Sequence, residues 1–359
     1  PPRPAAPPPP PAPRPPPPRP PPPDPQGAAG PPADPPQRAR DARARTCAPT
    51  LPRPVTRPVT RPVTRNTDER TDMSAVSAEY RQEWERWHRA RIDELASPYG
   101  WMSMVSQDWL TGDEPLQVEG VPGTWSVQDD EVVYTPDGSG ETVTLDGAPV
   151  TSPTPVSTGH KYSLVPAFYG DLRVETIRRT DATGRQIFGV RVRDPREAAR
   201  KRLDDIETFP LDERWVLPAR FTRTAEQASD YPTVERGVFE EQRVIGTVTF
   251  TLDGTEHTLL VAGRPDDDTG IERGNAHFTD TTSGKETYGN GRLVRVPDTE
   301  RDGDTVVDLN RAFSFPCAFT NFVTCPLAPA QNRLPVAVTA GEKKPPLQID
   351  RIQTFAQAS

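Results

Sequence analysis

Several kinds of sequence signal are scarce in this chain of 359 residues. It has only three cysteines and four histidines, which predicts neither a disulfide framework nor a histidine-rich metal centre. No apolar run approaches the roughly 18 residues of a membrane-spanning helix. The first residues also lack the apolar segment that is typical of a secretion signal. In the absence of any such signal, we expect a cytoplasmic protein without a membrane partner.

Positive charge is scarce outside the N-terminal segment. Residues 1–72 contain 12 Arg, no Lys and 6 acidic residues, a net charge of +6. Residues 73–359 contain 31 basic and 45 acidic residues, a net charge of −14. A body this acidic argues against nucleic acid or an anionic membrane as its main partner. The chain also lacks a P-loop, a dinucleotide-binding glycine motif, a Gly-x-Ser-x-Gly elbow and a His-Glu-x-x-His motif, so we expect no cofactor and no metal.

Proline is concentrated at the N-terminus, where residues 1–72 hold 27 of the 47 prolines. This composition cannot bury enough apolar surface to offset chain entropy, so a disordered or polyproline II tail is expected. Residues 53–64 repeat Arg-Pro-Val-Thr three times. The repeat fits either a ligand for a proline-recognising domain or, more simply, an unstructured tail or translated upstream DNA. Met73 would then be the true start of the protein.

Helical periodicity follows the tail. From residue 79 to residue 95, Tyr80, Trp84 and Trp87 fall on one face of a helix. Arg91 lies in the middle of that face. It either anchors the helix against an aromatic ring or a carboxylate, or it faces a ligand.

The pattern after Trp109 is that of short β-strands, interrupted by one short helix from an N-cap at Asp194 to about Ile206. The sequence therefore predicts a mainly β fold with two packed β units, sandwich or barrel-like, and an N-terminal helix. The expected parts are a tail (1–72), a helix and linker (73–110), a first β unit (111–194) and a second β unit (195–356). The expected strands are 131–135, 141–145, 172–178, 186–193, 215–221, 244–252, 257–262, 275–280, 292–296 and 305–309.

Several motifs occur in a fixed order in the C-terminal half. They read FTDTTSGKETYGNGR (278–292), DLNRAF (308–313), PCAF (316–319), CPL (325–327) and NRLP (332–335). Together with weaker matches near Trp87 and Trp109, they resemble the bacterial domain-of-unknown-function family 1684, which is common in actinobacteria. The resemblance spans about residues 80–345 and implies no known activity.

The motifs concentrate polar side chains in two places. Lys285 and Arg292 lie among three glycines whose exposed amides would suit an anion. If the strand expected at 305–309 continues to Arg311, Asp308 and Asn310 would lie on one face of it and Arg311 on the other. We expect both clusters to line one concave, partly buried site; the alternative is a tight hairpin beside an ion-paired strand end. The candidate ligand-binding residues are Thr282, Ser283, Lys285, Glu286, Tyr288, Arg292, Asp308, Asn310, Arg311, Asn332 and Glu342.

Three classes of function remain open. The preferred one is a binding or sensing module for a small anionic molecule. A second is a hydrolase or transferase with Glu286, Asp308 or Glu342 as acid or base, and a third is an interaction protein without a ligand. The sequence leaves open whether the protein is an enzyme, which ligand it takes, and its oligomeric state.

Two cysteines lie eight residues apart, each beside a proline. Cys317 and Cys325 are interpreted as buried structural thiols. The alternative is a cysteine nucleophile, with His257 or His277 as its base.

Overall fold

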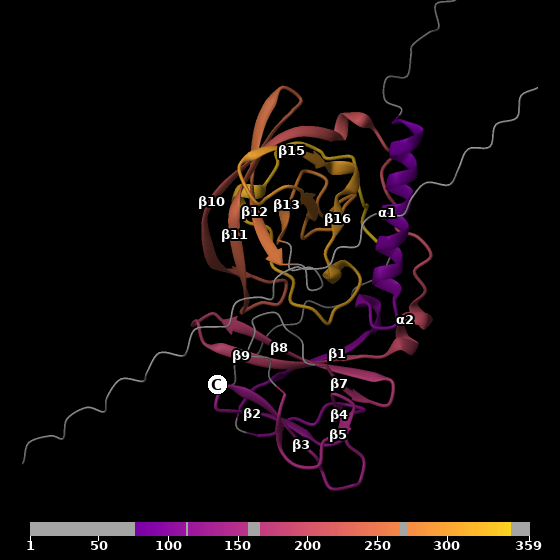
Figure 1. Cartoon of the computed structure of the whole chain (residues 1–359), viewed down its shortest axis with the longest axis vertical. Helices are drawn as coiled ribbons and strands as arrows, with labels where there is room; N and C mark the ends of the chain where they lie inside the picture. The colour runs from indigo at the N-terminus through magenta and orange to yellow at the C-terminus, as the bar shows by residue number, and fades with distance from the viewer. Residues whose placement is uncertain (1–75, 113, 157–165, 266–271, 346–359) are drawn as a thin grey trace, which may run out of the picture. The chain divides into compact units, whose positions relative to one another are not determined.

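The computed structural model describes residues 76–112, 114–156, 166–265 and 272–345. All of them belong to one compact unit, 69–359. The predicted disordered tail, its repeats, Cys47 and Met73 lie outside the described residues. Strands dominate the described chain, which confirms the prediction of a mainly β fold with an N-terminal helix (Figure 1).

The expected N-terminal helix is α1 (Ala78–Ala96). Ser77 caps it, its hydroxyl accepting from the Tyr80 amide over 3.1 Å. Its buried face carries Trp84, Arg91 and Leu95 among others, as the periodicity predicted. Among the described residues, no helix is both long and apolar enough to cross a membrane.

The first half of the described chain follows α1. Its elements are η1 (Trp101–Ser103), β1 (Met104–Leu110), β2 (Thr124–Gln128), β3 (Glu131–Thr135), β4 (Thr144–Leu145), β5 (Ala148–Pro149), β6 (Thr154–Pro155), β7 (Pro166–Tyr169), β8 (Leu172–Asp181) and β9 (Gln186–Arg193).

The second half begins with a short helix and continues through long strands. Its elements are α2 (Pro195–Lys201), η2 (Glu213–Trp215), β10 (Val216–Pro232), β11 (Val238–Leu252), β12 (Thr255–Pro265), β13 (Glu272–Phe278), β14 (Arg292–Val296), β15 (Gly303–Asp308), η3 (Leu309–Arg311), β16 (Phe313–Ser314), η4 (Pro316–Ala318) and η5 (Ala330–Asn332).

Most described strands form one large antiparallel sheet, in which β16, β14, β13, β12, β11, β8, β7, β4 and β5 follow one another. At one branch β10 pairs with β11 and β15, and at another β9 pairs with β8 and β1. The β11–β12 hairpin turns at Asp253 and Gly254, both with positive φ (50° and 76°), as the Asp-Gly pair predicted. The small sheet β2–β3–β6 stands apart from this path.

Three local predictions were wrong. The expected strand 141–145 is only the two-residue β4 (Thr144–Leu145), and it does not pair with β3, which pairs with β2 and β6. The short helix capped by Asp194 ends at Lys201, where Arg202 takes a positive φ of 41°, rather than near Ile206. The expected linker before residue 110 contains β1, which pairs with β9.

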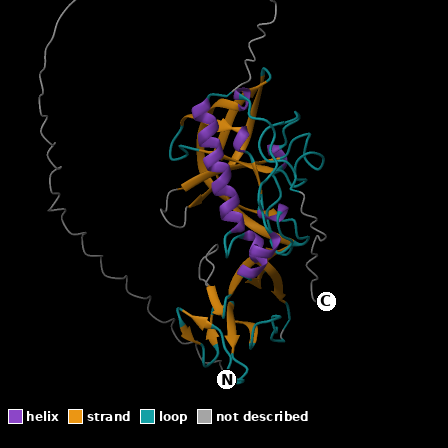
Figure 2. Ribbon diagram, turned by 90° about the vertical axis from the view of Figure 1, so that its right-hand side faces the viewer, coloured by secondary structure: helices purple, strands orange, loops and turns teal. Residues whose placement is uncertain are grey.

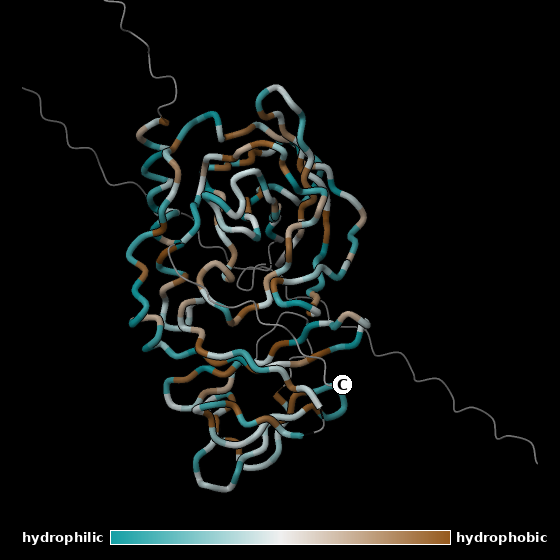
Figure 3. The backbone as a smooth tube through the Cα atoms, turned by 180° about the vertical axis from the view of Figure 1, so that it is seen from behind, coloured by the Kyte–Doolittle hydropathy of each residue, from teal (hydrophilic) through white to brown (hydrophobic). Residues whose placement is uncertain are grey.

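Two main hydrophobic cores underlie these strands. One is centred on Phe221, Leu259 and Phe278 in the second half, and the other on Trp125, Tyr134 and Val190 in the first. Figure 3 shows hydrophobic stretches running along the strands of both halves. One sheet runs through both, because β8 and β11 pair at Thr180↔Phe239 and its neighbour.

The helix α1 covers the side of the second half formed by β15, η3 and β16 (Figures 1 and 2). Trp84 donates from Nε1 to the Asn310 carbonyl over 2.9 Å, and Tyr80 donates to the Asp308 carboxylate over 2.8 Å. Arg91 donates from Nη2 to the Ser314 carbonyl over 2.7 Å. The start of the described chain is therefore fixed to residues more than 200 positions later.

Candidate functional site

The glycine-containing segment 282–292 folds as a self-contained turn. The Lys285, Glu286 and Thr287 amides all donate to the Thr282 carbonyl, over 3.0 to 3.2 Å. The Gly284 amide donates to the Thr287 carbonyl over 3.0 Å. Amides that already have a partner within the turn are not available to an anion. The expected anion-binding loop is thus replaced by the simpler alternative, a tight turn.

Arg292, expected to face a ligand, is fully buried. Its guanidinium donates to the Asp280 carboxylate over 2.9 Å and to the Val338 carbonyl over 2.9 Å, and it also donates to Ala340. Asp280 in turn accepts from the Thr282 hydroxyl over 2.5 Å. A buried cation with these partners holds the turn against the C-terminal loop, and its full burial closes it off from a ligand.

The second cluster is a docking point for α1 instead of a ligand site. Residues 309–311 form a 3-10 helix capped by Asp308, so the strand geometry that separated Asp308 from Arg311 was wrong. The two side chains form an ion pair of 3.2 Å, and Arg311 also lies 3.7 Å from the Glu83 carboxylate. Asn310 exchanges hydrogen bonds with the Asp212 backbone, donating over 2.9 Å and accepting over 3.3 Å.

The remaining candidates are scattered. Glu342 is fully buried, accepts from the Ser314 amide over 2.7 Å and pairs with Arg91 at 3.4 Å. Lys285 and Glu286 are exposed, Ser283 is partly exposed, and the buried Thr282 hydroxyl is occupied within the turn. Tyr288 donates to the Cys317 carbonyl over 2.8 Å.

Lys285, Arg292 and Arg311 therefore do not converge on one cleft. Lys285 is exposed, Arg292 is enclosed and Arg311 is ion-paired at the helix interface. Of the eleven candidates, only Asn332 lines the main cavity described below.

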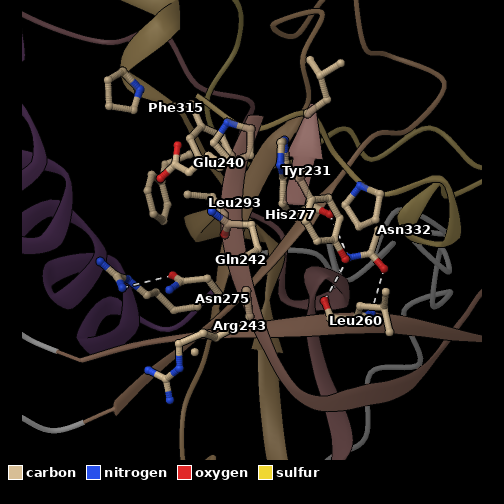
Figure 4. Close-up of a pocket in the computed structure, with 18 of the residues that line it drawn as sticks. Tyr231, Glu240, Gln242, Arg243, Leu260, Asn275, His277, Leu293, Phe315 and Asn332 are labelled. Atoms are coloured by element: carbon tan, nitrogen blue, oxygen red, sulfur yellow. Dashed lines mark hydrogen bonds between the residues drawn. The ribbon is translucent and has the colours of Figure 1, made fainter. Parts of the chain in front are cut away.

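That cavity has a volume of about 240 Å³ (Figure 4). It lies on the face of the sheet opposite the hydrophobic core of Phe221, Leu259 and Phe278. Side chains alternate along β13 and β14: Ala276 and Val294 point into the core, whereas His277 and Leu293 face the cavity. Cross-strand register places His277 beside Leu293 and Leu293 beside Phe313, which forms a continuous floor. Alternate side chains of β13 and β14 therefore form the floor of the cavity, while the side chains between them belong to the core on the other face of the sheet.

The walls of the cavity are mainly apolar and come from segments distant in sequence. Trp101 precedes β1, Phe315 and Pro316 follow β16, and Pro326 and Leu327 belong to the loop before η5. Concave cavities whose walls combine aromatic and other apolar side chains with fixed polar groups are typical of small-molecule sites.

His277 is the most constrained polar group in the cavity. Its Nε2 lies 2.7 Å from the Asn290 carbonyl, which only accepts, so Nε2 carries the proton and Nδ1 keeps a lone pair. Burial lowers the pKa of His277 to about 4, although the Asn290 bond opposes this shift. The ring packs against Phe315 at 4.3 Å. The structure thus holds a neutral imidazole in one tautomer.

Asn332 fixes the position of that histidine. Its amide donates to the Leu260 and His277 carbonyls over 2.9 and 2.8 Å, and its oxygen accepts from the Leu260 amide over 2.7 Å (Figure 4). All its polar atoms are therefore used by the backbone of β12 and β13. Asn332 lines the cavity as a support for other residues.

Charged side chains surround the floor, with three arginines and two glutamates. Arg91 pairs with Glu342, Arg243 pairs with Glu226 at 2.7 Å, and Arg295 donates to Asn275 over 3.1 Å. Glu240 lies 3.4 Å from Arg179, and Glu94 lies 3.8 Å from Arg91. Tyr231 also lines the cavity, and burial raises the pKa of its phenol.

Sequence reasoning considered His277 only as a base for a cysteine and missed the cavity. The alternation 275, 277 and 293, 295 was visible, but one face of such strands is ordinarily solvent. Nothing in the local pattern indicates that a helix 180 residues earlier and a proline-rich loop cover this face. In the described ranges, no group of three or more His, Cys, Asp or Glu residues is arranged to hold a metal ion.

Comparisons with known proteins agree with the motif analysis. No curated protein matches the chain. A solved structure with partial similarity is the solution NMR structure of an uncharacterised protein from Haloarcula marismortui. It is 28% identical, the match covers 40% of this chain and 78% of that one, and the TM-score is 0.34. Residues 201–343 match the family model described as "Protein of unknown function (DUF1684)", which is the family that the motifs resemble.

Proposed function

We propose that the protein binds a small, mainly apolar molecule with an anionic group in the cavity floored by β12, β13 and β14. The observation that carries the proposal is the cavity itself, about 240 Å³ of space with aromatic and proline walls around a neutral His277. Apolar walls supply binding free energy, and a few fixed polar groups orient the ligand.

The polar groups of the cavity determine the orientation of a bound ligand. The His277 Nδ1 lone pair accepts a hydrogen bond from a ligand donor, because Nε2–H is already bound to Asn290. The charges of the lining support an anionic group on the ligand. The lining contains three arginines and two glutamates, whereas residues 73–359 as a whole carry a net charge of −14. Because Arg91 and Arg243 also have the Glu342 and Glu226 carboxylates as partners, the surroundings of the cavity are close to neutral and admit an anion that the rest of the acidic surface would repel.

Binding is supported over catalysis because the two described carboxylates of the lining, Glu94 and Glu240, are paired with Arg91 and Arg179. His277 and Tyr231 are the lining groups with a shifted pKa, and in both the shift favours the neutral form. The carboxylates proposed for a hydrolase or transferase, Glu286, Asp308 and Glu342, lie in separate environments. A catalytic site needs two such groups in reach of one substrate.

Two fluorescent probes of matched shape test the proposal. Anilinonaphthalene sulfonate and its uncharged counterpart N-phenyl-1-naphthylamine share their rings and differ in the sulfonate. We expect both to bind, the sulfonate more tightly by about tenfold, as an attraction of about 1.4 kcal/mol would give. Equal affinities would refute the anionic group, and binding of neither probe would refute the site.

A matched pair of variants locates the probe. Ala262 lies on the cavity floor, whereas Ala148 is exposed in β5. Ala262→Trp fills the cavity and should weaken probe binding at least tenfold, while Ala148→Trp leaves it unchanged. Equal effects of the two substitutions would place the probe elsewhere. Native mass spectrometry of the purified protein would then identify a co-purified ligand.

A further inference from the structure

Cys317 and Cys325 lie together behind the cavity wall. Both are free and buried, and they pack in one cluster with Val323. Their neighbours in sequence, Pro316 and Pro326, line the cavity. The two thiols belong to the same small buried cluster, so residues that are eight apart in sequence lie close together in the fold.

The surroundings of the two sulfur atoms differ. Asn290 donates from Nδ2 towards Cys317 Sγ at 3.8 Å, and the same amide group holds the Pro326 carbonyl at 3.1 Å. Tyr288 donates to the Cys317 backbone and its hydroxyl also contacts the Cys317 thiol. Donors that converge on one sulfur stabilise its thiolate. Cys325 lacks this set of donors and acts as one of them.

The pKa values follow this asymmetry. Burial raises the pKa of the Cys317 thiol, but hydrogen bonds from Cys325, Tyr288 and Asn290 outweigh burial, so the pKa is lowered overall. Burial, together with the neighbouring Cys317, raises the pKa of Cys325 well above its usual range. The hydrogen bond from Asn290 to Cys317 Sγ therefore favours Cys317 as the nucleophile, with Cys325 as the neighbouring thiol.

We propose that Cys317 and Cys325 are a dithiol pair that a small hydroperoxide converts into an intrachain disulfide. Cys317 Sγ attacks one peroxide oxygen, the O–O bond breaks, and with hydrogen peroxide the products are a sulfenic acid and one water. Cys325 Sγ then attacks the sulfenic sulfur, the S–O bond breaks, and a second water leaves with the Cys325 proton. The two sulfurs lose two electrons in total, which the peroxide takes up.

The closeness of the two thiols makes the second step local. A disulfide places its sulfurs about 2.05 Å apart, and the two thiols already share one buried cluster from which such a bond can form. A sulfenic acid formed at Cys317 therefore has its resolving thiol already in place. The shift would move Pro316 and Pro326, and with them two segments of the cavity wall.

The test uses the full chain with Cys47→Ser, which removes the thiol outside the described residues. The reduced, folded protein is treated with hydrogen peroxide, and its peptides are mapped by mass spectrometry. We expect both remaining thiols to be lost together, with a cross-linked peptide joining Cys317 to Cys325. Cross-linking that occurs only in urea, or oxidation of each thiol independently, would overturn the proposal.

Single substitutions in the same background test the order of attack. With Cys325→Ser, Cys317 should stop at the sulfenic acid, which dimedone traps. With Cys317→Ser, Cys325 should react at least tenfold more slowly. Preferential trapping at Cys325 would contradict the assigned roles. If a serine variant does not fold, the corresponding alanine variant is used, and the cross-link in the Cys47→Ser protein is read in any case. No ligand is needed, so these outcomes are independent of the proposed binding function.

Discussion

Arg292 and Asp280 form an ion pair of 2.9 Å between two side chains that are 0% and 1% exposed. The pair closes the turn that carries the strongest sequence motif of the chain. Arg292 also reaches the carbonyls of Val338 and Ala340, so one guanidinium connects β14, the turn and the C-terminal loop. The motif residues Asp280 and Arg292 therefore have a structural role in this part of the fold.

Arg292→Ala should reduce the free energy of unfolding by about 3–5 kcal/mol, because it leaves the Asp280 carboxylate buried without its cation. Arg295→Ala, three residues along the same strand, is the matched control, because Arg295 is exposed and its loss should cost less than about 1 kcal/mol. Chemical denaturation measures both. Similar losses in the two variants would show that Arg292 has no special structural role.

Trp84→Ala should destabilise the protein by about 3–5 kcal/mol, since it removes a buried indole and its hydrogen bond to Asn310. Trp87 lies one turn later on the same helix but is only partly buried, so Trp87→Ala should cost clearly less. Thermal melting of the two variants compares them. A near-neutral Trp84→Ala would mean that α1 detaches from the sheet without loss of the fold.

His277 should make stability depend on pH. Its pKa falls from 6.5 in the unfolded chain to about 4 in the folded one, so the unfolded chain takes up the proton first as pH falls. The contribution is complete above pH 6.5 and is lost between pH 6.5 and 4, by about 3 kcal/mol. His277→Gln should lack this component. Denaturation at pH 7 and pH 4 gives the difference between variant and parent; identical pH profiles would contradict the buried neutral histidine.

Asn332→Ala should lower stability by about 1–3 kcal/mol, because it leaves the Leu260 amide and carbonyl without their side-chain partner. Asn332→Asp keeps the acceptor and loses the two donors, so it should also destabilise. Because Asn332 supports His277 and does not contact the ligand, its replacement should weaken probe binding only through a displacement of His277. An unchanged melting temperature with complete loss of probe binding would make Asn332 a ligand contact instead of a support.

The sequence was informative where a local rule decides the structure. Asp194 caps a helix as expected, and β3, β9 and β14 have the predicted bounds. These features depend on neighbours a few residues away.

The site was not predicted, because its residues are brought together by the fold. The concentration of polar and charged residues between Lys285 and Arg292 indicated a ligand site. In the structure, the backbone amides of this stretch form hydrogen bonds within the turn itself. The cavity depends on α1 and the loop around Pro326 covering the outer face of β13, and no periodicity of β13 carries that information.

The attachment of α1 also sets an order of events during synthesis on the ribosome. Trp84 and Tyr80 are translated 226 and 228 residues before the partners to which they bind, Asn310 and Asp308. The helix is therefore complete long before its binding surface exists, and until then the Trp84 indole has no native partner at Asn310. The contacts of α1 with residues 308–314 therefore form only after those residues are made, and a chain that stops short of residue 308 lacks the partners of Tyr80 and Trp84.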